Sequence, residues 1–133
     1  MIYPLLAMVA FTFILLFTGF VMRYRAVSTG EVSLGYFRLV SGDAPKYLQQ
    51  ATRHYSNLFE MPVLFYVAAL ICVLYPLEGS LISGLGWAYF VSRVAHAAVH
   101  LTYNNVIHRM LVFQVSNLAL IGLWVIIGME LTG

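Results

Sequence analysis

The chain has 133 residues, of which 62% are hydrophobic and only 9% are charged, and its mean hydropathy is +0.87. These values fit a small integral membrane protein with one all-α domain far better than they fit a soluble domain. The net charge is only +2, and the chain has no phosphate loop and no dinucleotide-binding motif, so nucleic-acid or nucleotide binding has no support.

Four apolar segments are long enough to cross a bilayer as helices, because about 20 residues at 1.5 Å each match the hydrocarbon thickness. The first is followed by Arg23 and Arg25, which act as a stop signal; a cleaved signal peptide is the competing interpretation. Short connections after the second and third segments favour antiparallel neighbours, and hence an up-and-down four-helix bundle. The predicted spans are residues 2–22, 57–75, 81–103 and 110–129.

A polar connector, residues 23–52, follows the first span and holds most of the basic residues. Asp43, followed by Ala44 and Pro45, is typical of a helix start, because the carboxylate can accept an unpaired backbone N–H. The second helix is therefore predicted to begin near residue 44, before the membrane. Pro62 is expected to bend this helix where it enters the apolar region.

The basic residues also predict the orientation. Lysine and arginine lie in the first and third connectors and are absent from the second connector and from both ends, so the positive-inside rule places the first and third connectors in the cytoplasm. Both termini then face a periplasm or lumen, and we expect the protein in a bacterial inner membrane. Two histidines near these connectors, His54 and His108, are expected to be solvated at the membrane interface.

The second predicted helix carries a polar stripe into the membrane. Arg53, Asn57 and Glu60 stand at i, i+4 and i+7, so they share one helix face. An ionised side chain at that depth costs roughly 2 to 3 kcal/mol or more unless it meets a partner inside the protein. The antiparallel third span brings Arg93 and His96 to the same level, and we predict that Glu60 pairs with one of them. A purely structural ion pair is the alternative to a functional one.

The third predicted span carries a second polar stripe. Arg93, His96 and His100 stand at i, i+3 and i+7 on one face. Tyr103 continues this face, and Arg109, at the mouth of the fourth span, is expected to cap the same cavity. This polarity exceeds what helix association requires, so the two stripes predict one binding cavity that opens to the cytoplasm.

A metal site is the competing interpretation of the histidines. His96 and His100 have the i, i+4 spacing that lets two imidazoles ligate one ion, and Glu60 could be a third ligand. Arg93 and Arg109 bring positive charge to the same pocket, which favours an anion and repels a divalent cation. We therefore expect no metal.

Taken together, these motifs resemble the MAPEG family, the membrane-associated proteins in eicosanoid and glutathione metabolism. The resemblance covers nearly the whole chain. Its most specific parts are Arg53-x-x-x-Asn57-x-x-Glu60 and Arg93-Val94-Ala95-His96. Arg109 follows Arg93 by sixteen residues, a spacing similar to that of the prostaglandin E synthase and microsomal glutathione transferase branch.

The resemblance implies a homotrimer that binds glutathione, its co-substrate, between adjacent subunits near the cytoplasmic face. Arg109 would sit beside the glutathione sulfur, where a guanidinium favours the nucleophilic thiolate. The implied function is a glutathione-dependent membrane transferase or peroxidase acting on lipophilic electrophiles or hydroperoxides that arrive from membrane lipid. The implied glutathione-binding set is Arg53, Asn57, Glu60, Arg93 and His96, with His100 and Tyr103 as substitute donors.

Three positions depart from that branch. Ser56 and His100 stand where it has a second arginine and a tyrosine, and Met110 replaces a serine next to the activating arginine. These departures favour an alternative, a non-catalytic protein with the same fold. Such a protein would be an accessory subunit of a membrane complex, or a binder of glutathione, lipid head groups or another anion.

Overall fold

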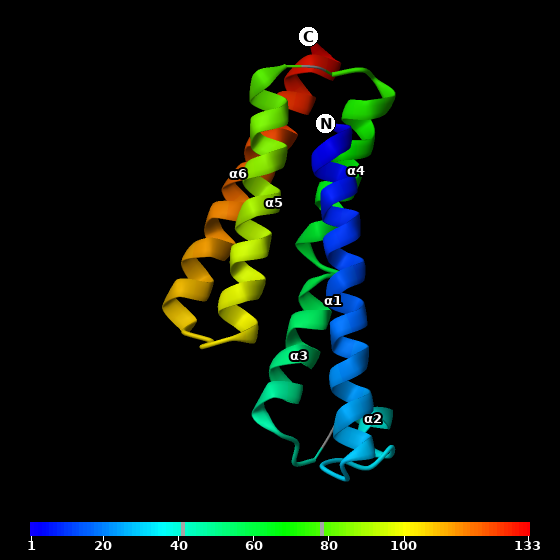
Figure 1. The fold of residues 1–133 in the computed structure, drawn as a ribbon. Coiled ribbons are helices and arrows are strands. Elements are labelled where there is room, and N and C mark those ends of the chain that lie inside the picture. Colours follow the sequence, from blue (N-terminus) through cyan, green and yellow to red (C-terminus); the bar gives the residue numbers. More distant parts are fainter. Residues whose placement is uncertain (41, 78) are drawn as a thin grey trace.

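The computed structural model describes residues 1–40, 42–77 and 79–133, and every regular element in these ranges is a helix (Figure 1). This confirms the all-α prediction. Ser41, in the predicted connector, and Glu78, in the predicted turn, lie outside the described residues. The helices are α1 (Ile2–Ser28), α2 (Tyr36–Leu39), α3 (Lys46–Asn57), α4 (Met61–Leu74), α5 (Ser80–Leu101) and α6 (Val106–Thr132).

Three helical segments are long and apolar enough to cross a membrane, namely Ile2–Ser28, Lys46–Leu74 and Val106–Thr132. This confirms a multi-pass integral membrane protein. Although α5 has 22 residues, it is not among these candidates, because its polar stripe, which includes Arg93 and two histidines, lowers its hydropathy. A fourth crossing by α5 therefore stays a prediction.

The helices lie side by side, with α5 against α6 and with α1 against α3, α4 and α5 (Figure 1). Both termini lie at the end of the molecule opposite α2 (Figure 1). The main core is apolar and includes Met8, Phe65, Tyr89 and Leu123, each fully buried. The rings of Phe65 and Tyr89 stack with centroids 4.4 Å apart and bring α4 into contact with α5.

The second predicted helix is broken rather than bent. Helix α3 ends at Asn57 and α4 begins at Met61, so residues 58–60 interrupt the helix. Pro62 lies in the first turn of α4, where its missing N–H needs no partner. In a continuous helix its ring would clash with the carbonyl of Leu58, four residues earlier. The helix is interrupted at residues 58–60, which avoids this clash, so the prediction of a continuous but bent helix is wrong.

The first connector is folded against α1 and α3. Helix α3 begins at Lys46 with Pro45 at the N-cap and no side-chain cap, so the predicted cap by Asp43 is not formed. The Arg23 guanidinium lies over the Tyr55 ring, 4.9 Å from its centroid, and links α1 to α3. The connector and its neighbours share a small second core of Ala26, Val32, Tyr36 and Leu48.

Helix α6 begins at Val106, ahead of the predicted residue 110. The cause is Asn105, whose side-chain oxygen accepts hydrogen bonds from the backbone N–H groups of Ile107 and His108 at 2.9 and 3.1 Å. The helix therefore includes Arg109 in its first turns.

Candidate functional site

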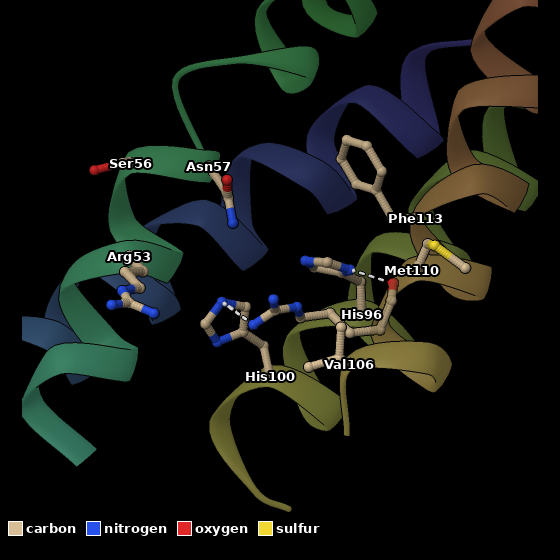
Figure 2. A pocket seen from close by; sticks show the side chains of 9 residues that line it. Arg53, Ser56, Asn57, His96, His100, Val106, Met110 and Phe113 are labelled. Carbon is tan, nitrogen blue, oxygen red and sulfur yellow. Dashed lines mark hydrogen bonds between the residues drawn. The ribbon is translucent and has the colours of Figure 1, made fainter. Parts of the chain in front are cut away.

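A cavity of about 590 Å³ opens between α3, the end of α5 and the start of α6 (Figure 2). Its volume is typical of a site for a small molecule. Within the described part of the chain, its lining includes two arginines and no carboxylate. The lining residues are Arg53, Ser56, Asn57, His96, His100, Val106, Arg109, Met110 and Phe113.

Helix α3 supplies one wall of this cavity. Arg53, Ser56 and Asn57 lie within about one helical turn of each other and share one face. Arg53 and Ser56 are exposed, whereas Asn57 is half-buried. The wall thus presents one guanidinium and one carboxamide across from the end of α5, whereas the Ser56 hydroxyl points away and donates to the backbone carbonyl of Thr52 at 3.5 Å (Figure 2).

Arg109 is held by two uncharged acceptors. Its Nη1 donates to Asn104 Oδ1 at 2.9 Å and lies 3.4 Å from His100 Nε2. Because arginine has only donors, this contact is a hydrogen bond only when His100 Nε2 is the acceptor, which requires the neutral tautomer with its proton on Nδ1. The backbone carbonyl of Arg109 also lies 3.2 Å from His96 Nδ1. These contacts join α5 to α6 at the cavity wall.

Three histidine rings pack together beside Arg109. The His54 ring centroid lies 6.0 Å from that of His96 and 5.1 Å from that of His100. All three residues are buried, and both ring nitrogens of His54 have no hydrogen-bond partner among the described residues. The prediction that His54 is solvated is therefore wrong. His54 shares a buried face of α3 with Ala51 and Leu58, each one helical turn away.

The histidine cluster is not arranged as a metal centre. In residues 1–40, 42–77 and 79–133, no group of three or more His, Cys, Asp or Glu side chains is placed to hold a metal ion. His96 and His100 each use one nitrogen in a contact with Arg109. These imidazoles therefore support the arginine in this structure.

Arg93 lies outside the cavity lining. It is only 2% exposed, its Nη2 donates to the backbone carbonyl of Asn57 at 3.5 Å, and its guanidinium lies 5.8 Å from the centroid of the Phe113 ring. The carbonyl of Asn57 is one of those that the end of α3 leaves without a helical partner. Arg93 therefore caps α3, and its positive charge suits the negative end of the helix dipole.

Glu60 and Tyr103 also lie outside the cavity lining. Glu60 is exposed, and no described residue forms an ion pair with it, so its predicted pairing with Arg93 or His96 is not formed within the chain. Its backbone, with φ −101° and ψ −107°, has left the helical conformation, so its side chain does not continue the α3 face. Tyr103 is 62% exposed, and its hydroxyl lies 3.0 Å from Nδ1 of His108.

The structure thus brings five of the eight predicted residues together, namely Arg53, Asn57, His96, His100 and Arg109. The sequence analysis missed Val106, Phe113 and Asn104. Phe113 stands one helical turn after Arg109, so helical periodicity could have placed it on the same face. Asn104 had no such signal, because its position depends on how α5 ends.

Comparison with known families agrees with this architecture. The model of the MAPEG family matches residues 1–129. Searches of curated proteins and of solved structures found no match. The family match covers nearly all of the 133 residues and therefore all six helices but for the last turn of α6. The chain belongs to the MAPEG family.

Proposed function

We propose that the chain is a glutathione-dependent membrane transferase or peroxidase that acts on lipophilic electrophiles or hydroperoxides. The observation that carries this proposal is the cavity of about 590 Å³, whose lining has two arginines and no carboxylate among the described residues. Such a site favours an anion. Glutathione carries two carboxylates and a thiol, and membership of a glutathione-associated family favours it over other anions.

Arg53 and Asn57 are suited to the polar ends of glutathione. Arg53 lies exposed on the cavity wall, where a guanidinium can bind a carboxylate through two parallel hydrogen bonds. The Asn57 carboxamide offers both a donor and an acceptor to an amide or carboxylate of the tripeptide. These two residues would orient the ligand, and His96 and His100 would line its opposite side.

Arg109 is suited to activate the thiol. The thiolate is the nucleophile, and an adjacent guanidinium lowers the thiol pKa by stabilising the charged form. In conjugation, the sulfur lone pair forms a carbon–sulfur bond and the leaving group departs with its electron pair. In peroxide reduction, the sulfur attacks the terminal oxygen and gives an alcohol and a sulfenic acid. A second glutathione then converts this acid to the disulfide and water.

The proposal includes a homotrimer with four membrane crossings in each subunit. Exposed Glu60 and Tyr103 lie outside the cavity of the single chain, and one guanidinium nitrogen of Arg93 is buried without a partner among the described residues. A neighbouring subunit would supply partners for such groups. We also propose that the first and third connectors are cytoplasmic, since they hold most of the lysine and arginine residues.

A second candidate function is a non-catalytic anion binder. The observation that favours it is that Glu60, Arg93 and Tyr103, three residues of the implied glutathione-binding set, do not line the cavity. The site that keeps Arg53, Asn57, His96, His100 and Arg109 would still bind a glutathione or a lipid head group. It would not need to activate a thiol.

The first test is the thermal stability of the detergent-purified protein against rising glutathione. A ligand that binds only the folded state raises the transition temperature by mass action. We expect a saturable rise that Asn57→Ala abolishes and that Arg38→Ala, an exposed arginine on α2, leaves unchanged. A flat response at millimolar glutathione would contradict glutathione binding.

A second measurement separates the enzyme from the binder. The purified protein is assayed for conjugation of an aromatic electrophile and for reduction of a lipid hydroperoxide. We expect turnover that falls at least about a hundredfold in Arg109→Ala, since one lost electrostatic contact to a developing charge costs roughly that much. A saturable thermal shift without turnover of either substrate would favour the non-catalytic function.

A further inference from the structure

We propose that Asn104 is a positioning residue that holds the Arg109 guanidinium against the cavity, where it can stabilise the bound thiolate. This inference rests on the proposed function and extends it to a residue outside the cavity lining. Three features carry it: the backbone of Asn104, its short contact with Arg109, and the charges that surround both.

The end of α5 fixes the backbone of Asn104. Its N–H donates to the carbonyl of Val99 at 2.8 Å, which closes the last turn of the helix. Its φ is +48°, in the left-handed region, which asparagine adopts more readily than most residues other than glycine. The side chain therefore starts from a defined point beside the first turns of α6, where Arg109 lies.

The contact with Arg109 is short and uncharged. Asn104 Oδ1 accepts from Arg109 Nη1 at 2.9 Å, whereas His100 Nε2 lies farther from the same nitrogen, at 3.4 Å. Both contacts use Nη1, and no described residue accepts a hydrogen bond from the other two guanidinium nitrogens. These nitrogens remain available to a ligand. Because neither acceptor is a carboxylate, the guanidinium keeps its full positive charge for the sulfur.

The surrounding charges explain why a tether is needed. Asn104 also lines a neighbouring cavity of about 160 Å³ together with Lys46, Arg53 and His100. Arg53 lines the cavity of about 590 Å³ together with Arg109, so the two guanidinium groups repel each other. Without a fixed acceptor, this repulsion would favour conformations that turn Arg109 away from the ligand. Asn104 opposes the repulsion and adds no negative charge.

The neighbouring asparagine provides a matched control. Asn105 is exposed and caps α6 through its side-chain oxygen, and this side chain makes no hydrogen bond with the Arg109 guanidinium. Its backbone carbonyl accepts from the Arg109 backbone N–H at 3.0 Å, a bond that Asn105→Ala retains. Loss of the side chain lowers helix stability and leaves the guanidinium contacts in place. Comparison of the two asparagines therefore separates positioning of Arg109 from support of the α5–α6 turn.

The test measures the pKa of bound glutathione, from the ultraviolet absorbance of its thiolate, in the parent, Asn104→Gly, Asn104→Asp and Asn105→Ala. Glycine adopts a φ of +48° without strain, so Asn104→Gly keeps the turn and removes only the carboxamide. We expect the thiol pKa of glutathione bound to this variant to rise by about one unit, which is roughly a tenfold loss of thiolate at neutral pH. The kcat should fall to match, and KM should change less.

The other variants sharpen the interpretation. Asn104→Asp keeps the acceptor but neutralises the guanidinium, so the thiol pKa should also rise although Arg109 stays held. Asn105→Ala should lower Tm and leave the thiol pKa unchanged. If the thiol pKa of bound glutathione is lowered in the parent and is the same in Asn104→Gly, the positioning role is overturned and the proposed function survives. If the parent shows no lowered thiol pKa, the proposed function fails, and this inference fails with it.

Discussion

His54→Leu is expected to stabilise the protein. His54 is 3% exposed, and neither ring nitrogen has a partner among the described residues. Burial of a polar group without a hydrogen bond costs about 1 to 3 kcal/mol, and leucine removes this cost. The substitution also loses the ring contacts with His96 and His100, and an aromatic pair contributes roughly 0.5 to 1.5 kcal/mol. Because two such pairs are lost, they offset much of the gain, and the free energy of unfolding should rise by at most about 1 kcal/mol.

The assay is reversible unfolding in detergent micelles, with His108→Leu as the matched control. His108 is exposed and its side chain makes one hydrogen-bonding contact, with the Tyr103 hydroxyl, so loss of that side chain should change stability by less than about 0.5 kcal/mol. A loss of more than about 1 kcal/mol in His54→Leu would refute the reasoning. It would mean that the buried nitrogens are hydrogen-bonded in the working protein and that the cluster is held together by those bonds.

Four further substitutions test the packing. Arg93→Lys cannot hold the Asn57 carbonyl in the same geometry, and we expect a loss of about 1 to 2 kcal/mol in unfolding free energy with less than about threefold change in glutathione affinity. In Gly84→Ala the new Cβ meets nothing within 4 Å, so the free energy of unfolding should rise by up to about 1 kcal/mol through helix propensity. In Gly86→Ala the new Cβ would lie 3.2 Å from Pro4 Cβ, so this variant should be clearly less stable than Gly84→Ala. Phe65→Ala removes a fully buried ring and should cost about 3 to 5 kcal/mol; a loss below about 1 kcal/mol in the same unfolding assay would contradict the packing of α4 on α5.

Helical periodicity accounts for the part of the site that could be predicted. Residues three, four or seven apart share a helix face whatever the rest of the fold does. Arg53 and Asn57 on α3, and His96 and His100 on α5, therefore reached one cavity as expected. Arg109 joined them because the short α5–α6 connection leaves little choice of position.

The rest of the site depends on contacts that no local pattern in the sequence predicts. Arg93 caps a backbone carbonyl, and any residue type supplies a carbonyl, so its partner has no signature in the sequence. The burial of His54 depends on α3 packing against α5, which brings it to His96 and His100. The polarity of His54 alone suggests a side chain at the membrane interface. The predicted turn that includes Glu78 falls partly outside the described residues.

The interruption between α3 and α4 explains why Glu60 does not form its predicted pair and why the cavity lining is positively charged. A helix that continued past Asn57 would carry Glu60 on the face of Arg53 and would use the Asn57 carbonyl in its own hydrogen bonding. The break frees that carbonyl for Arg93 and turns Glu60 out to the surface. Arg93 is thereby bound to backbone, and no carboxylate reaches the cavity from the described residues. The charges of Arg53 and Arg109 are then left for a ligand to balance, and an anionic thiol such as glutathione would do so.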